Sequence, residues 1–136
     1  MNNMKKSLEE QSERMQKFNS EQIALHEKNK TEEDFTLDNL LFLIRKWAVD
    51  RNLHTADSSK QALKLGEEYG ELCEGLSKGK PELIKDALGD MFVVMVILAM
   101  QEGLDFTECV EMAYEEIKDR KGKMVDGVFV KEVDLQ

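Results

Sequence analysis

The chain has 136 residues, which is enough for one compact domain and too few for two of ordinary size. Its formal net charge of −9 argues against binding to duplex nucleic acid, because lysine and arginine drive contact with phosphates. The same charge is compatible with a small anionic ligand if divalent metal ions supply the positive charge.

The N-terminal segment, residues 1–34, is polar and rich in Glu, Gln, Lys and Ser. We expect it to form a long, weakly amphipathic helical arm that docks on the rest of the protein or on a partner; a flexible tail is the alternative. A break is expected at residues 31–34. The predicted organisation is therefore an arm over residues 1–34 and a main domain over residues 35–136.

A second helix is predicted to begin after Thr36, which is a suitable N-cap, and to end near Arg51. Its apolar residues recur at three- and four-residue spacing, which predicts one buried face. These residues are Leu37, Leu40, Leu41, Ile44, Trp47 and Ala48.

The third and fourth helices are predicted to form an antiparallel hairpin. A capping-box pattern that starts at Ser58 opens the third helix, and Gly79 ends it. The fourth helix begins at Pro81, where the missing N–H costs nothing, and ends at Gly103. Because only a few residues join the two helices, they should lie side by side.

A fifth helix is predicted from Asp105 to about Arg120. The turn dipeptide at 126–127 lies between short apolar pieces, which predicts a small hairpin or an extended strap. Gly66 and Gly70 on the third helix are expected to allow a close approach between helices. Helices thus account for almost the whole chain, and the expected fold class is all-α.

The third helix carries an E-E-x-x-E pattern at Glu67, Glu68 and Glu71. The apolar residues of this helix, Tyr69 and Leu76 among them, define a face that leaves Glu68 at its edge. On this helix alone, a solvated acidic surface with lysine partners is an equally good interpretation.

The fourth helix carries Asp86 and Asp90, which share one face because they are four residues apart. The run at residues 91–100 is apolar all round, which is typical of a buried helix. The two aspartates therefore enter or border a buried face, where a carboxylate needs a partner.

The hairpin should bring the two groups of carboxylates together. Asp90 lies 11 residues after Gly79 and Glu68 lies 11 residues before it, so the two arms of equal length meet there. Close carboxylates repel one another unless divalent cations lie among them. Oxygen ligands without His or Cys favour Mg²⁺, with Mn²⁺ as a substitute, over Zn²⁺. We predict that Glu68, Glu71, Asp86 and Asp90 hold Mg²⁺.

Two other kinds of site are excluded at the level of motifs. A di-iron carboxylate bundle needs Glu-x-x-His, and neither His26 nor His54 has a glutamate three residues before it. A phosphate-binding P-loop motif is also absent from the sequence.

The acidic motifs resemble those of the MazG-like all-α nucleoside triphosphate pyrophosphohydrolases of the compact, phage type. In this chain they read L-G-E-E-Y-G-E-L at residues 65–72 and K-D-A-L-G-D-M at residues 85–91. The basic stretch at residues 116–123 is similar to the one that follows the fifth helix in such proteins. The resemblance covers residues 36–134. It implies a helical-hairpin bundle, here with an extra N-terminal helix and a short C-terminal strap or hairpin.

The resemblance also implies an activity: Mg²⁺-dependent cleavage between the α- and β-phosphates of a (d)NTP, which gives a monophosphate and pyrophosphate. By motif position, Glu68, Glu71 and Asp90 match metal ligands. Glu67 matches a residue that supports the ligands or acts as a base, and either Glu67 or Glu71 would activate the attacking water. A homodimer or homotetramer is implied as well.

The second motif departs from the family pattern. Ala87 stands where the motif has a glutamate, and Asp86 stands one residue earlier. Asp86 still shares a face with Asp90, but the number of bound metal ions stays open.

Residues outside the acidic motifs are candidates for contacts with the nucleotide. Gln61 and Lys64, just before the motif, should line the pocket, and Trp47 is a candidate for stacking on the base, with core packing as the alternative. A basic cluster after the fifth helix should contact the β- and γ-phosphates; the alternative is that it complements the helix dipole. The cluster consists of Lys118, Arg120, Lys121 and Lys123.

Two further functions compete with this interpretation. One is a non-catalytic, dimeric helical interaction module, and the other is a related hydrolase that acts on a different nucleotide, such as a phosphoribosyl-linked one. The cellular location follows from simpler features. The longest apolar run is about half the ~20 residues that a membrane span needs, and the N-terminus lacks the apolar stretch of a secretory signal. We expect a cytoplasmic protein without membrane contact.

Overall fold

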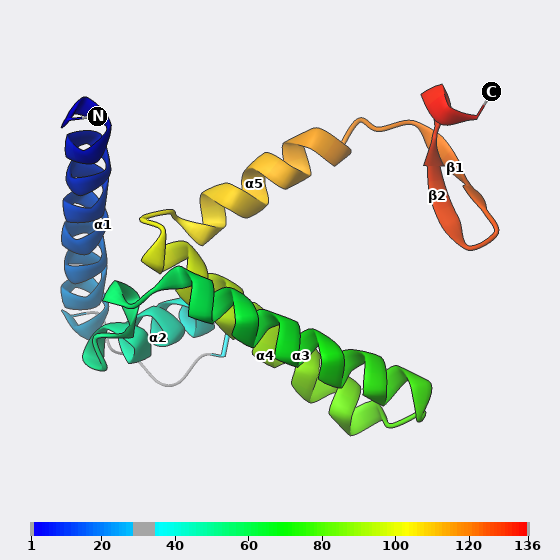
Figure 1. Ribbon diagram of the computed structural model, residues 1–136, viewed down its shortest axis with the longest axis horizontal. Coiled ribbons are helices and arrows are strands. Elements are labelled where there is room, and N and C mark those ends of the chain that lie inside the picture. The colour runs from blue at the N-terminus through cyan, green and yellow to red at the C-terminus, as the bar shows by residue number, and fades with distance from the viewer. Residues whose placement is uncertain (1, 29–34, 136) are drawn as a thin grey trace. The chain divides into compact units, whose positions relative to one another are not determined.

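The computed structural model describes residues 2–28 and 35–135 (Figure 1). Within these ranges the regular secondary structure is helical apart from one short hairpin, which confirms the predicted all-α fold. The helices are α1 (Asn2–Lys28), α2 (Leu37–Asp50), α3 (Ser58–Ser77), α4 (Pro81–Gln101) and α5 (Phe106–Ile117), with the 3-10 helices η1 (Leu53–Thr55) and η2 (Glu132–Asp134). The strands are β1 (Gly122–Val125) and β2 (Val128–Lys131).

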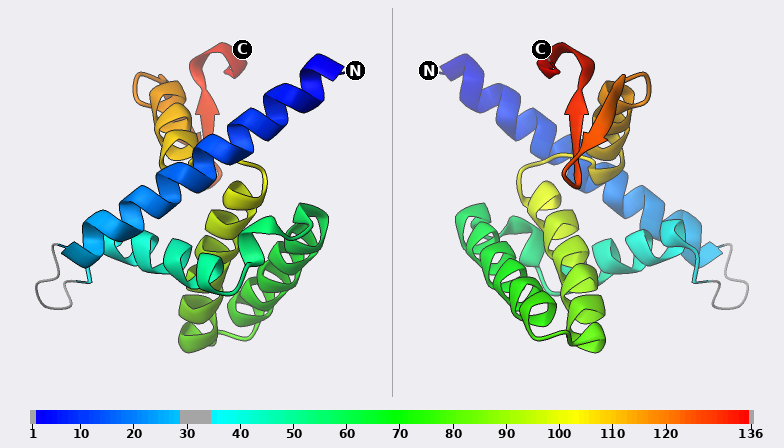
Figure 2. Two further views of the ribbon diagram at one scale, coloured as in Figure 1. Left: turned by 90° about the vertical axis from the view of Figure 1, so that its left-hand side faces the viewer. Right: turned by 90° about the vertical axis from the view of Figure 1, so that its right-hand side faces the viewer.

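The structure divides into two compact units, Met1–Phe106 and Thr107–Gln136. The predicted N-terminal helix is confirmed as α1, which contacts α2 within the first unit (Figure 2). The predicted break at residues 31–34 lies outside the described residues, so the division into an arm and a main domain stays a prediction. No helix in the described ranges is both long enough and apolar enough to cross a membrane.

Local hydrogen bonds fix where α2 and α3 begin. The Thr36 hydroxyl accepts a bond of 3.3 Å from the Asn39 N–H, as predicted for an N-cap. At α3 the predicted capping box was wrong by one residue. The N-cap is Asp57, whose carboxylate accepts bonds from the N–H and the hydroxyl of Ser59 at 2.9 and 2.8 Å, and Ser58 is already helical. A carboxylate in this place gains from the helix dipole as well as from the hydrogen bonds.

The helices α3 and α4 lie side by side as an antiparallel hairpin (Figure 2). Gly79, with a φ of +60°, closes α3 as predicted. The close approach of the two helices occurs at the buried Gly75, where an added Cβ would lie 2.9 Å from Cγ1 of Ile84. Gly66 and Gly70 have nothing within 4 Å of such a Cβ, so the expectation that they allow the approach was wrong.

The hydrophobic core lies between α2, η1 and the C-terminal half of α4. Its buried members are Leu41, Ala48, Val96, Ile97 and Met100. An ion pair beside this core joins α2 to the segment after α4, since Nη2 of Arg45 lies 2.9 Å from Oδ1 of Asp105 and both side chains are 16% exposed. This framework fixes α2 against α4, which positions the cavity described below.

The second unit ends in a hairpin, one of the two predicted forms. β1 and β2 pair antiparallel across a two-residue turn at 126–127, where both φ angles are positive, at 51° and 80°. α5 ends at Ile117, about three residues before the predicted end at Arg120. The Lys118 and Arg120 N–H groups still donate to the carbonyls of Tyr114 and Ile117, at 2.9 and 3.0 Å, and the Glu132 N–H donates to the carbonyl of Lys121 at 2.9 Å.

Candidate metal centre and adjoining cavity

The face of α3 that packs against α4 carries a glutamate. Gln61, Glu68 and Gly75 recur every seven residues along this face, and Glu68 is only 4% exposed. By contrast, Tyr69 and Leu76 are 58% and 61% exposed. The expectation of a buried apolar face with Glu68 at its edge was therefore wrong for Tyr69 and Leu76, although Leu65 and Leu72 of the same predicted face are half-buried. The buried face is the one that presents a carboxylate to α4.

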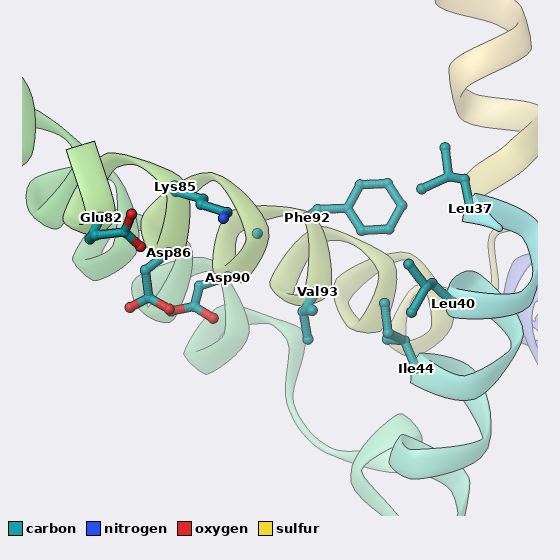
Figure 3. A pocket seen from close by; sticks show the side chains of 10 residues that line it. Leu37, Leu40, Ile44, Glu82, Lys85, Asp86, Asp90, Phe92 and Val93 are labelled. Atoms are coloured by element: carbon teal, nitrogen blue, oxygen red, sulfur yellow. The ribbon is translucent and has the colours of Figure 1, made fainter. Parts of the chain in front are cut away.

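Three carboxylates from α3 and α4 converge. Glu68, Glu71 and Asp90 each offer an oxygen, and these oxygens lie within 4.8 Å of one another. This confirms the expectation that the equal arms of the hairpin bring the two acidic motifs together. Asp86 is not part of this group of three. It lies beside Asp90 on α4 (Figure 3), and its charge acts on both Asp90 and Glu71.

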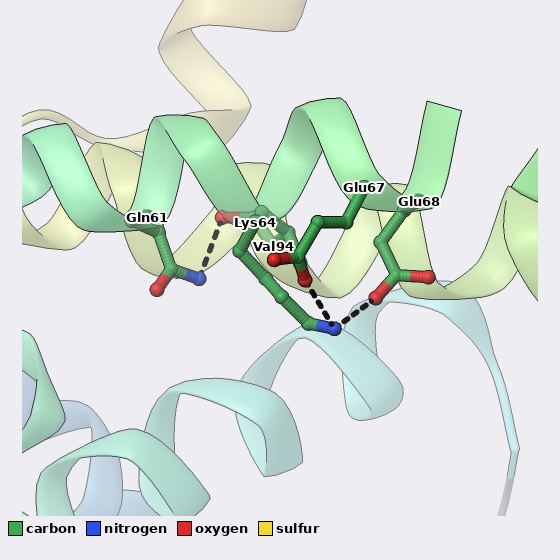
Figure 4. A network of polar contacts seen from close by, with 5 residues as sticks. All are labelled: Gln61, Lys64, Glu67, Glu68 and Val94. Carbon is green, nitrogen blue, oxygen red and sulfur yellow. Dashed lines mark hydrogen bonds and ion pairs between the residues drawn. The ribbon is translucent and has the colours of Figure 1, made fainter. Parts of the chain in front are cut away.

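The carboxylate of Glu68 is satisfied on one side only (Figure 4). Nζ of Lys64 lies 2.7 Å from Oε1 of Glu68 and 3.2 Å from Oε2 of Glu67. The other oxygen, Oε2 of Glu68, is buried and has no hydrogen-bond partner. A buried acceptor without a partner is unfavourable, and here it lies among other carboxylates. This donor set, made of oxygens alone, fits a hard divalent cation.

The charges in the cluster disfavour one another. The negative charge of Glu68, together with burial, raises the pKa of Glu71. Burial raises the pKa of Asp90, and the charges of Asp86 and Glu68 add to this effect. Lys64 responds in the opposite sense, because its hydrogen bonds to Glu68 and Glu67 raise its pKa. The cluster therefore holds more negative charge than Lys64 balances, which is the condition under which a metal ion is favoured.

A cavity of about 700 Å³ lies between α2 and α4 and shares Asp90 with the cluster (Figure 3). One end is charged, and the side chains of Glu82, Lys85, Asp86 and Asp90 line it. The other end is apolar, and the side chains of Leu37, Leu40, Ile44, Phe92 and Val93 line it.

The first unit also contains the other predicted substrate contacts, Gln61, Lys64 and Trp47. Nε2 of Gln61 donates to the carbonyl of Val94 on α4 at 3.4 Å, and Lys64 pairs with the two glutamates (Figure 4). Trp47 is 46% exposed, carries the Arg51 guanidinium 4.3 Å from its ring centre, and is not among the residues that line the cavity. Contact of these three residues with a nucleotide stays a prediction.

The predicted basic cluster belongs to the second unit. Two of its members pair with glutamates of α5, Lys118 with Glu115 and Arg120 with Glu116, the latter at 3.4 Å. The other two, Lys121 and Lys123, are exposed. Their predicted contact with phosphates stays a prediction.

The apolar wall of the cavity was not predicted as part of a site. Leu37, Leu40 and Ile44 were assigned to the core, because three- and four-residue spacing predicts an apolar face without showing what covers it. Phe92 and Val93 belong to the apolar run of α4, which was likewise predicted to be buried. No signal in the sequence separates the wall of a cavity from a packed core.

Comparison with known proteins gives two matches. Residues 45–121, more than half of the chain, match the family described as phosphoribosyl-ATP pyrophosphohydrolase. The chain is also 54% identical over 70 residues to a protein of Haemophilus phage HP1 (strain HP1c1) described as "Uncharacterized 18.2 kDa protein in rep-hol intergenic region". That match covers 51% of this chain and 43% of the phage protein. No solved structure matches the chain.

Proposed function

The chain belongs to the phosphoribosyl-ATP pyrophosphohydrolase family, within the MazG-like all-α superfamily, and we propose that it is a Mg²⁺-dependent nucleoside triphosphate pyrophosphohydrolase. It would cleave the α–β phosphoanhydride of a (d)NTP and release a monophosphate and pyrophosphate. The observation that carries this proposal is the convergence of Glu68, Glu71 and Asp90, together with the buried, unpartnered oxygen of Glu68. The likeness to a phage protein is in keeping with the compact, phage type of the superfamily.

The metal ion would be held by Glu68, Glu71 and Asp90, with Asp86 as a further ligand from the same face of α4. Ligands of this kind favour Mg²⁺, and Mn²⁺ would substitute for it. When bound, the ion supplies positive charge that attracts phosphate oxygens and neutralises the charge on the leaving pyrophosphate.

We assign the activation of the attacking water to Glu67. The side chain of Glu67 is 66% exposed and lies outside the group of three converging carboxylates, whereas Glu71 contributes an oxygen to that group. Glu67 would orient a water and take its proton as the water oxygen attacks the α-phosphorus and the bond to the β-phosphate breaks. Nζ of Lys64, 3.2 Å from Oε2 of Glu67, would help to hold this carboxylate in place.

The remaining contacts follow the sequence prediction with one exception. Gln61 and Lys64 would border the nucleotide, whereas the proposal does not include the predicted stacking of Trp47 on a base, because Trp47 does not line the cavity. Basic side chains of the second unit would bind the β- and γ-phosphates. They are Lys118, Arg120, Lys121 and Lys123.

A homodimer or homotetramer is part of the proposal. Tyr69 and Leu76 on α3 and Leu88 on α4 are between 55% and 61% exposed in the single chain. Large apolar side chains that are exposed on the same helical hairpin support contact with another protein surface. Sedimentation would test this; a monomer at micromolar concentration would reject it.

The family match supports a second candidate substrate, phosphoribosyl-ATP. Its hydrolysis would use the same carboxylates and release the same pyrophosphate. The two candidates differ only in the group that the α-phosphate carries.

Product analysis tests the proposal. The protein would be incubated with Mg²⁺ and a panel of canonical and modified dNTPs, with phosphoribosyl-ATP as a separate arm, and the products separated. Monophosphate plus pyrophosphate is expected, whereas diphosphate plus orthophosphate would reject the assigned bond. Glu71→Gln and Asp90→Asn should lose turnover with helix content unchanged by circular dichroism. Normal rates in both variants would remove these residues from the site.

A further inference from the structure

The cavity between α2 and α4 has two ends of different chemistry (Figure 3). Asp86 and Asp90 lie at one end, and Asp90 also belongs to the carboxylate cluster. A ligand whose phosphates are held at the cluster would therefore extend its remaining part into this cavity. A volume of about 700 Å³ is typical of a pocket for a small organic molecule.

The far end of the cavity offers apolar surface alone. Among the described residues that line it, none carries a hydrogen-bond donor or acceptor on its side chain; they are Leu37, Leu40, Ile44, Phe92 and Val93. A flat aromatic ring gains from such a surface through burial of its two faces. The edge of the ring, where nucleobases differ from one another, would find no side chain to bond with.

From this arrangement we infer that the apolar end holds the nucleobase of the substrate by its faces, and that the protein consequently binds nucleotides with little regard to the base. The inference rests on the proposed function and adds the part of the substrate that this end accepts. An apolar pocket discriminates weakly between ligands of similar shape, by about 100-fold at most, whereas a hydrogen-bonding site rejects a mismatched group by about 10⁴.

The wall of this end is held in place from behind. Phe92 packs edge-on against Phe106, with ring centres 5.4 Å apart. Ile44, Phe92 and Val93 also pack against the buried core. A wall fixed in this way gives a ring a preformed surface, which lowers the entropic cost of binding.

The test measures binding by calorimetry with Mg²⁺ and the α,β-methylene analogues of dATP, dCTP, dGTP and TTP. Inorganic tripolyphosphate serves as the probe without a base. In the wild type the four analogues should bind with Kd values within about 100-fold of one another, and all more tightly than tripolyphosphate. A larger spread among the bases would overturn the inference.

Leu40→Ser removes apolar surface from the wall. It should raise the Kd of all four analogues by about tenfold and leave tripolyphosphate within about twofold of the wild type. The matched control is Leu43→Ser on the same helix, because Leu43 is 41% exposed and does not line the cavity. Val93→Thr keeps the shape of the wall and adds a hydroxyl, so it should also raise the Kd of all four analogues. It serves as the second variant if Leu40→Ser folds poorly.

Three outcomes with the variants also reject the inference. The first is that the affinity of the analogues falls by less than about threefold in both wall variants. The second is that the affinity of tripolyphosphate falls as much as that of the analogues. The third is that Leu40→Ser dissociates an oligomer with nucleotide affinity unchanged, in which case a second copy of the chain covers this end. Product analysis separates the two proposals. Pyrophosphate release with strong discrimination among the bases would support the proposed function and reject the nucleobase site. Base-tolerant binding without pyrophosphate release would support the nucleobase site and reject the proposed function.

Discussion

Lys64 holds one oxygen of Glu68 at 2.7 Å, while the other oxygen of the same carboxylate is buried without a hydrogen-bond partner. Lys64 itself is half exposed at the side chain, whereas the side chain of Glu68 is 5% exposed. The lysine therefore fixes the orientation of a buried carboxylate and leaves its second oxygen to the cluster. This asymmetry distinguishes the pair from an ordinary surface ion pair on a helix.

Lys64→Met should destabilise the metal-free protein, because the buried Glu68 loses the cation that balances it. Glu68→Gln in the same chain should recover most of the loss, since an amide carries no charge. Urea unfolding of the wild type, both single variants and the double variant gives the coupling free energy. If the two substitutions are additive, the pair does not act as a unit.

Divalent metal should stabilise the wild type and not the cluster variants. At a Mg²⁺ or Mn²⁺ concentration of 100 times Kd, the free energy of unfolding should rise by about 2.7 kcal/mol. Glu71→Gln and Asp90→Asn should lose this increment, but they should raise the melting temperature of the metal-free protein because repulsion in the cluster is relieved.

The matched control for this experiment is Glu111→Gln, which removes one charge from an exposed residue of α5. It should keep the full response to metal. A wild-type melt that is the same with and without metal would instead favour the non-catalytic interaction module, in which the acidic residues are solvated.

The parts of the fold that the sequence predicted correctly depend on local signals. The hairpin of α3 and α4 follows from Gly79 and Pro81, and the meeting of Glu68 with Asp90 follows from counting equal arms back from that turn. Such predictions succeed because the turn fixes the register of two rigid helices, which leaves little freedom for the residues that face each other.

The failures concern choices that only packing decides. α3 has apolar residues on more than one side, and Gly75 selects the face that approaches α4 closely because it has no side chain. The close approach at Gly75 buries Glu68 and leaves Tyr69 exposed, although Tyr69 is the more hydrophobic of the two residues. The cavity beside α2 could not be predicted for the same reason. An apolar stripe predicts that a helix face is buried, but not whether that face packs in the core or lines a cavity.

The N-cap of α3 gives a prediction that distinguishes two neighbouring residues, Asp57 and Ser58. Asp57→Ala should lower the melting temperature, because Ser59 loses the acceptor of its N–H, while Ser58→Ala should have little effect. The bond from the Ser59 N–H lowers the pKa of Asp57, so its contribution is present above the unfolded pKa of about 3.8 and is lost as the pH falls through the folded value. Asp57→Asn should keep much of the cap and lose this pH dependence. Equal melting curves for Asp57→Ala and Ser58→Ala would contradict the assignment.

Gly75 and Gly70 should respond to alanine with opposite signs, although both lie inside the same helix. At Gly75 the new Cβ would lie 2.9 Å from Cγ1 and 3.1 Å from the backbone nitrogen of Ile84, so α3 and α4 must move apart. We expect a loss of about 1–3 kcal/mol in the free energy of unfolding. At Gly70 nothing lies within 4 Å, and alanine should stabilise the helix by about 1 kcal/mol. Urea unfolding of the two variants measures both effects, and a stabilising Gly75→Ala would show that the close contact between the helices at Ile84 does not form in solution.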